Sequence, residues 1–151
     1  MKEIKSMHRK KTPLSLTLLD IEYPTMIGIM KVLKPFNKLY KSNKLDMGFL
    51  APRTELEEKI REYTYEIGPN DPDLEQLRLN DVGHYAMVLT YANKKDIPFH
   101  VVGKKSIERD TTKIIEEMRT KSKSNAVGIV NTENLDFYKE YFSDKGFELN
   151  D

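Results

Sequence analysis

Three acidic side chains stand where α/β proteins commonly place their chemistry. A hydrophobic stretch over residues 14–19 runs directly into Asp20, at what would be the carboxyl end of a buried strand. Glu57 falls in the first turn of a predicted helix, and Asp81 opens a long amphipathic helix. Carboxylate oxygens suit Mg²⁺ or Mn²⁺, and carboxylates that lie close together need a cation to stay ionised. If the three meet, we expect a divalent ion that generates hydroxide and clamps a phosphodiester.

Each of these acids also has a simpler structural interpretation. Asp20 has the right place to cap a helix that begins near Pro24. Thr54 and Glu57 have the spacing of a capping box, which is the stronger interpretation of Glu57 from the sequence alone. Asp81 has the place of a plain N-cap. The sequence therefore leaves metal binding and helix capping open for these positions.

Two further polar residues are weaker candidates. Asp110 follows the apolar pair Val101 and Val102 by several residues, and we interpret it as the N-cap of the helix that carries Ile114. His84 lies one turn after the start of its predicted helix, where it could contact a phosphate or a metal-bound water. A lone histidine is more often a partly buried structural residue, and that interpretation is favoured here.

Apolar runs and turn residues predict strands that alternate with helices. A helix near Pro24 should end or kink at Pro35. The predicted strands cover residues 14–19, 47–51, 99–102 and 126–130, with helices from about residues 24, 54, 81, 107 and 132. Such alternation predicts an α/β fold, a three-layer α/β/α sandwich with a mostly parallel central sheet. At 151 residues we expect a basic N-terminal segment over residues 1–12 and a single domain over residues 13–151.

Composition narrows the possible chemistry. The chain has no cysteine, which excludes disulfides, thiol catalysis and cysteine-bound zinc. Its 32% of charged residues and the absence of a long apolar run predict a cytoplasmic protein without a membrane span. The net charge is only +1, but basic side chains crowd the N-terminus and the stretch over residues 31–44. A basic surface beside an acidic centre is typical of metal-dependent enzymes that act on nucleic acids. For any single lysine, the simpler interpretation is a solvated surface side chain without a ligand.

Several segments resemble the PIN-domain nucleases, especially the stand-alone ribonucleases of toxin–antitoxin pairs. The resemblance covers most of the chain after the basic N-terminus. It rests on the order of these segments: Leu18-Leu19-Asp20; Phe49-Leu50-Ala51-Pro52 with Leu56-Glu57-Glu58; Leu79-Asn80-Asp81-Val82-Gly83-His84-Tyr85-Ala86; Phe99-His100-Val101-Val102; and Gly128-Ile129-Val130-Asn131-Thr132-Glu133-Asn134-Leu135.

The resemblance implies a PIN-like fold and a metal-dependent endoribonuclease. Asp20, Glu57 and Asp81 would be the catalytic acids and would hold Mg²⁺ or Mn²⁺. RNA would be the substrate, with an antitoxin or another protein as a partner and a homodimer as a possible assembly. Lys10, Lys11, Lys104 and Lys105 would bind the RNA backbone.

The chain departs from the family at two places. Ile21 and Glu22 follow the first acid, where the family has a small hydroxyl or amide residue. Gly103, Lys104 and Lys105 stand where the family has its fourth acid, directly after the strand that ends near Val102. These lysines favour an alternative function, a catalytically inactive PIN-like domain that binds RNA or a protein.

Two other enzyme classes fit less of the sequence. One class is the haloacid-dehalogenase-type phosphohydrolases. Their paired acids at a strand end are similar to Asp20 and Glu22, and their phosphate-binding lysine is similar to Lys104, but the family's other acids are missing. Residues 137–147 are similar to the last helix and strand of acetyltransferases, but the chain has no glycine-rich loop to bind a cofactor pyrophosphate.

Overall fold

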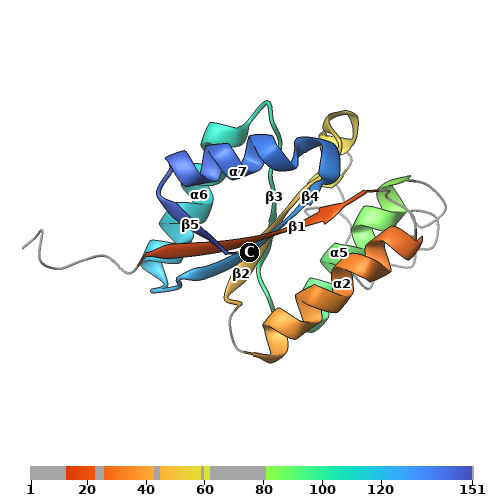
Figure 1. Cartoon of the computed structure of the whole chain (residues 1–151), viewed down its shortest axis with the longest axis horizontal. Helices are drawn as coiled ribbons and strands as arrows, with labels where there is room; N and C mark the ends of the chain where they lie inside the picture. The colour runs from red at the N-terminus through yellow and green to blue at the C-terminus, as the bar shows by residue number, and fades with distance from the viewer. Residues whose placement is uncertain (1–12, 23–25, 43–44, 59, 62–80, 151) are drawn as a thin grey trace, which may run out of the picture.

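We describe the fold from a computed structural model that places residues 13–22, 26–42, 45–58, 60–61 and 81–150, with the backbone alone for residues 26 and 81–84. The elements are β1 (Leu14–Ile21), α2 (Met26–Lys41), β2 (Met47–Ala51), the 3₁₀ turn η1 (Thr54–Leu56), α5 (Asp81–Lys94), β3 (Phe99–Val101), α6 (Ile107–Thr120), β4 (Asn125–Asn131), the 3₁₀ turn η2 (Thr132–Asn134), α7 (Leu135–Asp144) and β5 (Phe147–Asn150) (Figure 1).

The strands form one parallel sheet. Its strand order is β3-β2-β4-β1-β5, and every neighbouring pair is parallel. A parallel sheet needs a crossover between successive strands, and the described helices supply these crossovers. The predicted α/β fold with a parallel sheet and helices on both faces is therefore confirmed.

Two layers of helix cover the sheet. In β1, Leu14 and Leu16 pack toward α6 and α7, whereas Ile21 packs toward α2 and α5. Side chains alternate in the same way in β2, where Phe49 packs toward α6 and α7 and Leu50 packs toward α2 and α5. The central strands are thus buried on both faces, as their continuous apolar sequence predicts.

The structure corrects two details of the predicted elements. Helix α2 continues through Pro35 to Lys41 instead of ending there, because Ile29, Val32 and Phe36 bury one continuous face of the helix on both sides of the proline. The C-terminal strand β5 pairs with β1 and was not among the predicted strands. Its four residues are too few to give a clear alternating pattern.

Candidate functional site

The connections of the sheet place the candidate site outside the carboxyl ends of β2 and β4. These strands are neighbours, with Ala51 in register with Val130. The chain leaves β2 toward β3, with α5 on one face, and leaves β4 toward β5, with α7 on the opposite face. Open α/β sheets bind ligands where the connections of neighbouring strands diverge in this way. The residues at these two strand ends are therefore the first to consider.

Glu57 is buried at this edge of the sheet. Its side chain is 5% exposed, and its Oε1 atom accepts a hydrogen bond from the backbone N–H of Lys104 at 3.1 Å. It packs so closely on Gly103 that a side chain at that glycine would collide with the carboxylate. The start of η1 has no side-chain capping bond, so the predicted capping box with Thr54 is wrong. Glu57 instead ties the segment after β2 to the end of β3.

A second buried carboxylate, Asp110, lies beside the same glycine. It accepts hydrogen bonds from Arg61 Nη2 at 2.6 Å, from the Ser106 hydroxyl at 2.6 Å and from the Gly103 N–H at 3.0 Å. Burial alone would raise the pKa of Asp110, but the hydrogen bonds from Arg61, Ser106 and Gly103 and the charge of Arg61 outweigh it and lower the pKa. Asp110 is therefore ionised in a salt bridge. Since α6 begins at Ile107, after Ser106, the predicted N-cap role of Asp110 is wrong.

Tyr138 of α7 lies close to both buried acids. Burial raises the pKa of its hydroxyl, and the negative charges of Glu57 and Asp110 raise it further. The phenol therefore stays protonated at any physiological pH. The two carboxylates and this phenol belong to one polar cluster beneath the loop that follows β3.

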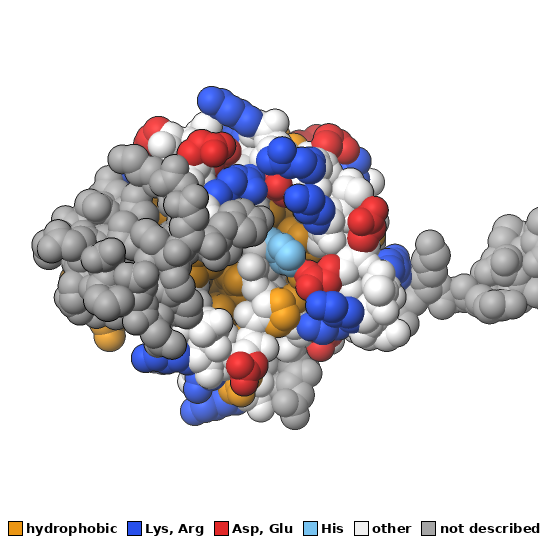
Figure 2. Space-filling model, turned by 180° about the vertical axis from the view of Figure 1, so that it is seen from behind, with side chains coloured by type: hydrophobic (Ala, Val, Ile, Leu, Met, Phe, Trp, Pro, Cys, Tyr) orange, Lys and Arg blue, Asp and Glu red, His pale blue; other side chains and the backbone are white. Residues whose placement is uncertain are grey.

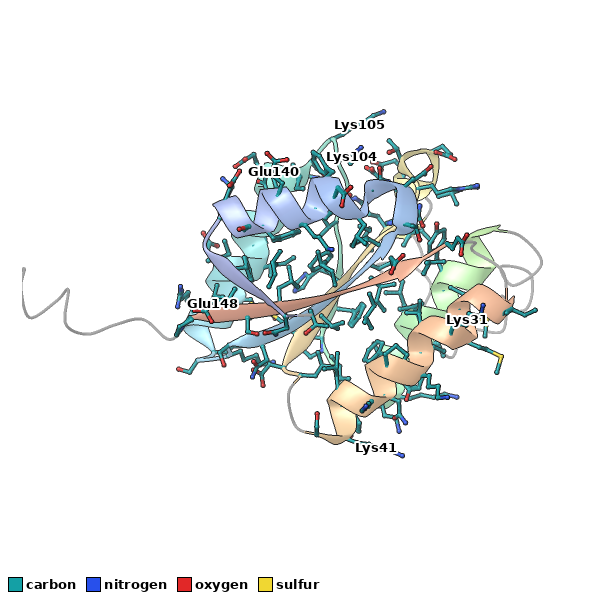
Figure 3. All side chains as sticks on the ribbon, viewed as in Figure 1. Lys31, Lys41, Lys104, Lys105, Glu140 and Glu148 are labelled. Carbon is teal, nitrogen blue, oxygen red and sulfur yellow. The ribbon has the colours of Figure 1, made fainter. Side chains whose placement is uncertain are left out.

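Lys104 lies at the surface of this cluster. Its ammonium Nζ is 3.1 Å from Asn134 Oδ1 and 4.7 Å from the centre of the Phe137 ring. The Phe137 side chain is 39% exposed, although it is large and apolar. Lys105 is exposed next to it, and Figure 3 shows both lysines on the loop after β3. The contact between Lys104 and Asn134 joins the loops that follow β3 and β4, which lie on either side of the end of β2.

The ends of β1 and β4 supply a further polar group. Asp20 is exposed, and its Oδ2 atom accepts a hydrogen bond from the Thr132 hydroxyl at 2.6 Å. Asn131 is 5% exposed, and its Oδ1 atom accepts a hydrogen bond from the Tyr85 hydroxyl at 2.7 Å. The Nδ2 atom of Asn131 is buried without a hydrogen-bond partner among the described residues. A buried donor of this kind is costly, and a ligand is one way to satisfy it.

The structure brings some of the predicted site residues to one edge and leaves others undescribed. Asp20 and Glu57 both lie at the carboxyl edge, and Lys104 and Lys105 follow β3 there. The backbone of Asp81 starts α5, but its side chain, that of His84, and both Lys10 and Lys11 lie outside the described residues.

The described carboxylates do not form a metal site by themselves. No group of three His, Cys, Asp or Glu side chains in the described part of the chain is arranged to hold a metal ion. Asp20, Glu57 and Asp110 each accept a hydrogen bond from a protein donor. A set of Mg²⁺ or Mn²⁺ ligands at this edge would need a contribution from residues such as Asp81 whose side chains are not described.

Several residues of the cluster were not predicted as site residues. Arg61 lies in a segment that reads as an ordinary charged helix, and Asn134 and Phe137 follow a strand without a distinctive spacing. Asn131 directly follows the apolar run over residues 126–130, which is the signal that the sequence offers for it. Contacts between residues 33 and 49 positions apart, Phe137 with Lys104 and Arg61 with Asp110, are not visible in a sequence.

No protein-family model, curated protein or solved structure matches the chain. In the described part of the chain, no helix combines the length and the apolar character that crossing a bilayer requires.

Proposed function

We propose that this protein is an RNA-binding domain that holds single-stranded RNA at the carboxyl edge of its sheet and does not need a metal ion to bind it. The observation that carries the proposal is the pairing of Lys104 with the exposed ring of Phe137 beside the diverging ends of β2 and β4. Aromatic rings stack on unpaired bases, and lysines bind the adjacent phosphates, so this pair suits a single strand. It corresponds to the catalytically inactive PIN-like alternative.

The hydrogen bonding of the carboxylates supports binding rather than catalysis. Glu57 and Asp110 are buried and are occupied by a backbone amide, a hydroxyl and a guanidinium group. A cation that binds Asp110 would have to compete with Arg61, at the cost of this buried ion pair. On the same loop Lys105 is exposed, and the half-buried Lys104 lies against Asn134 and Phe137.

Binding of a labelled single-stranded RNA of mixed sequence, followed by fluorescence anisotropy in EDTA and in Mg²⁺, tests the proposal. We expect equal affinity in both buffers and an affinity that falls steeply with salt. Phe137→Ala should weaken binding about tenfold, as the loss of one stacking contact does. Replacing Lys104 and Lys105 with Gln removes two phosphate contacts. The slope of log affinity against log salt should therefore become shallower by about 1.4, the value for two contacts on a single strand.

Lys113→Gln is the matched control, because Lys113 is an exposed lysine on α6 with no role in the cluster. It should bind RNA as the natural sequence does. No binding by the natural sequence, or equal binding by all variants, would show that the carboxyl edge is not an RNA site. Thermal unfolding of each variant checks that the fold is unchanged.

A metal-dependent endoribonuclease is the second candidate function. It is favoured by the position of Asp20 and Glu57 at the same edge of the sheet, with Asp81 at the start of a helix. In this case Asp20, Glu57 and Asp81 would hold Mg²⁺ or Mn²⁺. Cleavage of the same RNA in Mn²⁺, stopped by EDTA and abolished by Asp20→Asn and by Asp81→Asn, would establish the nuclease. The expected antitoxin or other protein partner and the homodimer stay predictions.

A further inference from the structure

The outer face of α2 carries an unusual run of exposed side chains. Lysines at positions 31, 34, 38 and 41 are all exposed, and their spacing of three, four and three residues places them along one side of the helix. Ile27 and Met30, 68% and 61% exposed, continue the same side toward the helix start. We call the four lysines the α2 lysine row. Figure 3 shows Lys31 and Lys41 near opposite ends of the helix.

No acidic side chain compensates the α2 lysine row within its own helix. The 16 residues of α2 contain four lysines and no Asp or Glu. No ion pair or hydrogen bond involves any of the four ammonium groups in the described part of the protein. Two lysines near the opposite layer are paired instead: Lys121 with Glu117 at 2.8 Å, and Lys145 with Glu108 at 3.0 Å.

Charge is distributed differently along the α2 lysine row and on the face seen in Figure 2, where Lys and Arg side chains lie beside Asp and Glu side chains. The electric fields of neighbouring opposite charges cancel one another at a short distance from the surface. Salt screens the remaining field beyond about 8–10 Å. The α2 lysine row has no such cancellation along its own helix, so it attracts anions over its whole length.

The surface of α2 is also hollowed where the row is densest. A shallow hollow of about 610 Å³ is lined by Lys34, Pro35, Asn37, Lys38, Lys41 and Ser42. Most of its surface is apolar, and its polar side chains are three lysines, Asn37 and Ser42, whose hydroxyl donates to the Leu39 carbonyl oxygen. Three of the four lysines of the row therefore surround the hollow.

We infer that the α2 lysine row binds the phosphate backbone of RNA without regard to its sequence. Lys31 and Lys41 are ten residues apart, so the row extends about 15 Å along the helix, enough for several phosphates. Four residues separate the end of β1 at the carboxyl edge from the start of α2, so the row leads away from the edge that contains Lys104 and Phe137. That the ligand is RNA rests on the proposed function. The inference adds a second binding surface, separate from the one that contains Lys104 and Phe137.

An anionic lipid bilayer is the competing partner for a basic helix with exposed apolar residues. Ile27 and Met30 would then enter the lipid surface while the lysines contact head groups. The structure favours RNA, because the exposed apolar pair occupies only one end of the helix, whereas the four lysines occupy the rest of its length. A helix that lies on a bilayer would gain most from apolar residues along the whole exposed side.

The double variant Lys34→Gln/Lys38→Gln tests the inference, with Lys113→Gln/Lys121→Gln on the α6 side as the matched control for charge. Affinity for the same labelled RNA is measured from 50 to 200 mM salt. The α2 variant should lower the slope of log affinity against log salt by about 1.4, whereas the control should leave it unchanged. The advantage of the natural sequence over the α2 variant should therefore shrink about sevenfold across this fourfold range of salt.

The outcomes separate this inference from the proposed function. Binding that depends on Lys104, Lys105 and Phe137 but not on Lys34 and Lys38 would overturn the inference alone. No RNA binding by the natural sequence would overturn the proposed function and the inference together. Sedimentation with vesicles of phosphatidylserine and phosphatidylcholine is the third measurement. Vesicle binding that the α2 variant abolishes, with RNA binding unchanged, would assign the row to a bilayer and overturn the inference.

Discussion

The buried salt bridge between Arg61 and Asp110 is the clearest case of a residue whose role depends on its partners. Asp110 is 4% exposed at its side chain, and Arg61 is 15% exposed. A buried carboxylate is costly unless a cation and several donors compensate it, and here Arg61, Ser106 and the Gly103 amide do so. The pair fixes the segment after β2 against the start of α6, and thereby the loop that carries Lys104.

Replacing Asp110 with Asn should destabilise the fold by about 3 kcal/mol at pH 7, because it leaves the Arg61 guanidinium half-buried without its counter-charge. The folded pKa of Asp110 is lowered, so its contribution is present above the unfolded pKa of about 3.9 and is lost as pH falls through the folded value. The difference in stability between the two proteins should therefore begin to shrink as pH falls below about 4, and it should vanish only below the folded pKa. Urea unfolding at pH 7 and pH 3 measures both values.

Asp136→Asn, at an exposed position of α7, is the control for the loss of one acidic charge. It should change stability by less than about 0.5 kcal/mol at either pH. A pH-independent loss in the Asp110 variant would mean that the carboxylate stabilises the fold by shape or hydrogen bonding rather than by charge.

At the scale of elements, close contact between strands and helices depends on a glycine in β4. Gly128 lies in the centre of the sheet, in register with Leu18 of β1 and Phe49 of β2. An added methyl group there would collide with the Phe49 ring and would lie 2.7 Å from Leu18 Cδ2. The missing side chain gives Phe49 the room to stack on Phe142 of α7, with ring centres 4.9 Å apart.

Gly128→Ala should lower the free energy of unfolding by about 1–3 kcal/mol, because the core cannot hold the extra methyl group without displacing Phe49. Chemical denaturation measures the change. Adding Phe49→Leu tests the cause, since a smaller side chain at 49 gives the methyl group room. The double variant should then lose less stability than the sum of the two single losses. Strict additivity would show that Phe49 is not the group that the methyl meets.

At the scale of the whole molecule, the described residues form two hydrophobic cores, one on each face of the sheet. Ile29 belongs to the core under α2 and α5, and Ile114 belongs to the core under α6 and α7. The strands separate the two cores but take part in both, so each core holds the sheet that the other needs. We therefore expect the fold to unfold as one cooperative unit.

Ile29→Val and Ile114→Val should each cost about 1 kcal/mol, and the double variant should lose their sum within about 0.5 kcal/mol. Each of the three variants should unfold in a single transition. For each variant, circular dichroism and tyrosine fluorescence should give the same midpoint. A transition that splits into two steps in either single variant would show that the layers unfold separately.

Much of the fold follows from the sequence, and for a local reason. The strand predicted over residues 47–51 matches β2, and the alternation of strands and helices correctly predicts a parallel sheet. Both signals come from hydrophobic periodicity, which reports how each segment is buried. Capping and helix ends were less predictable, as Thr54 and Pro35 show, because packing can override a local preference.

What the sequence alone determined is the class of fold and the placement of Asp20, Glu57 and Lys104 near strand ends. What only the tertiary structure decided is the strand order, which puts β4 between β1 and β2, and the partners of each charged side chain. Asp110 reads as a helix cap in the sequence but is a buried ion partner of Arg61, 49 residues away. Periodicity is a property of neighbours along the chain, whereas a charge is stabilised by neighbours in space.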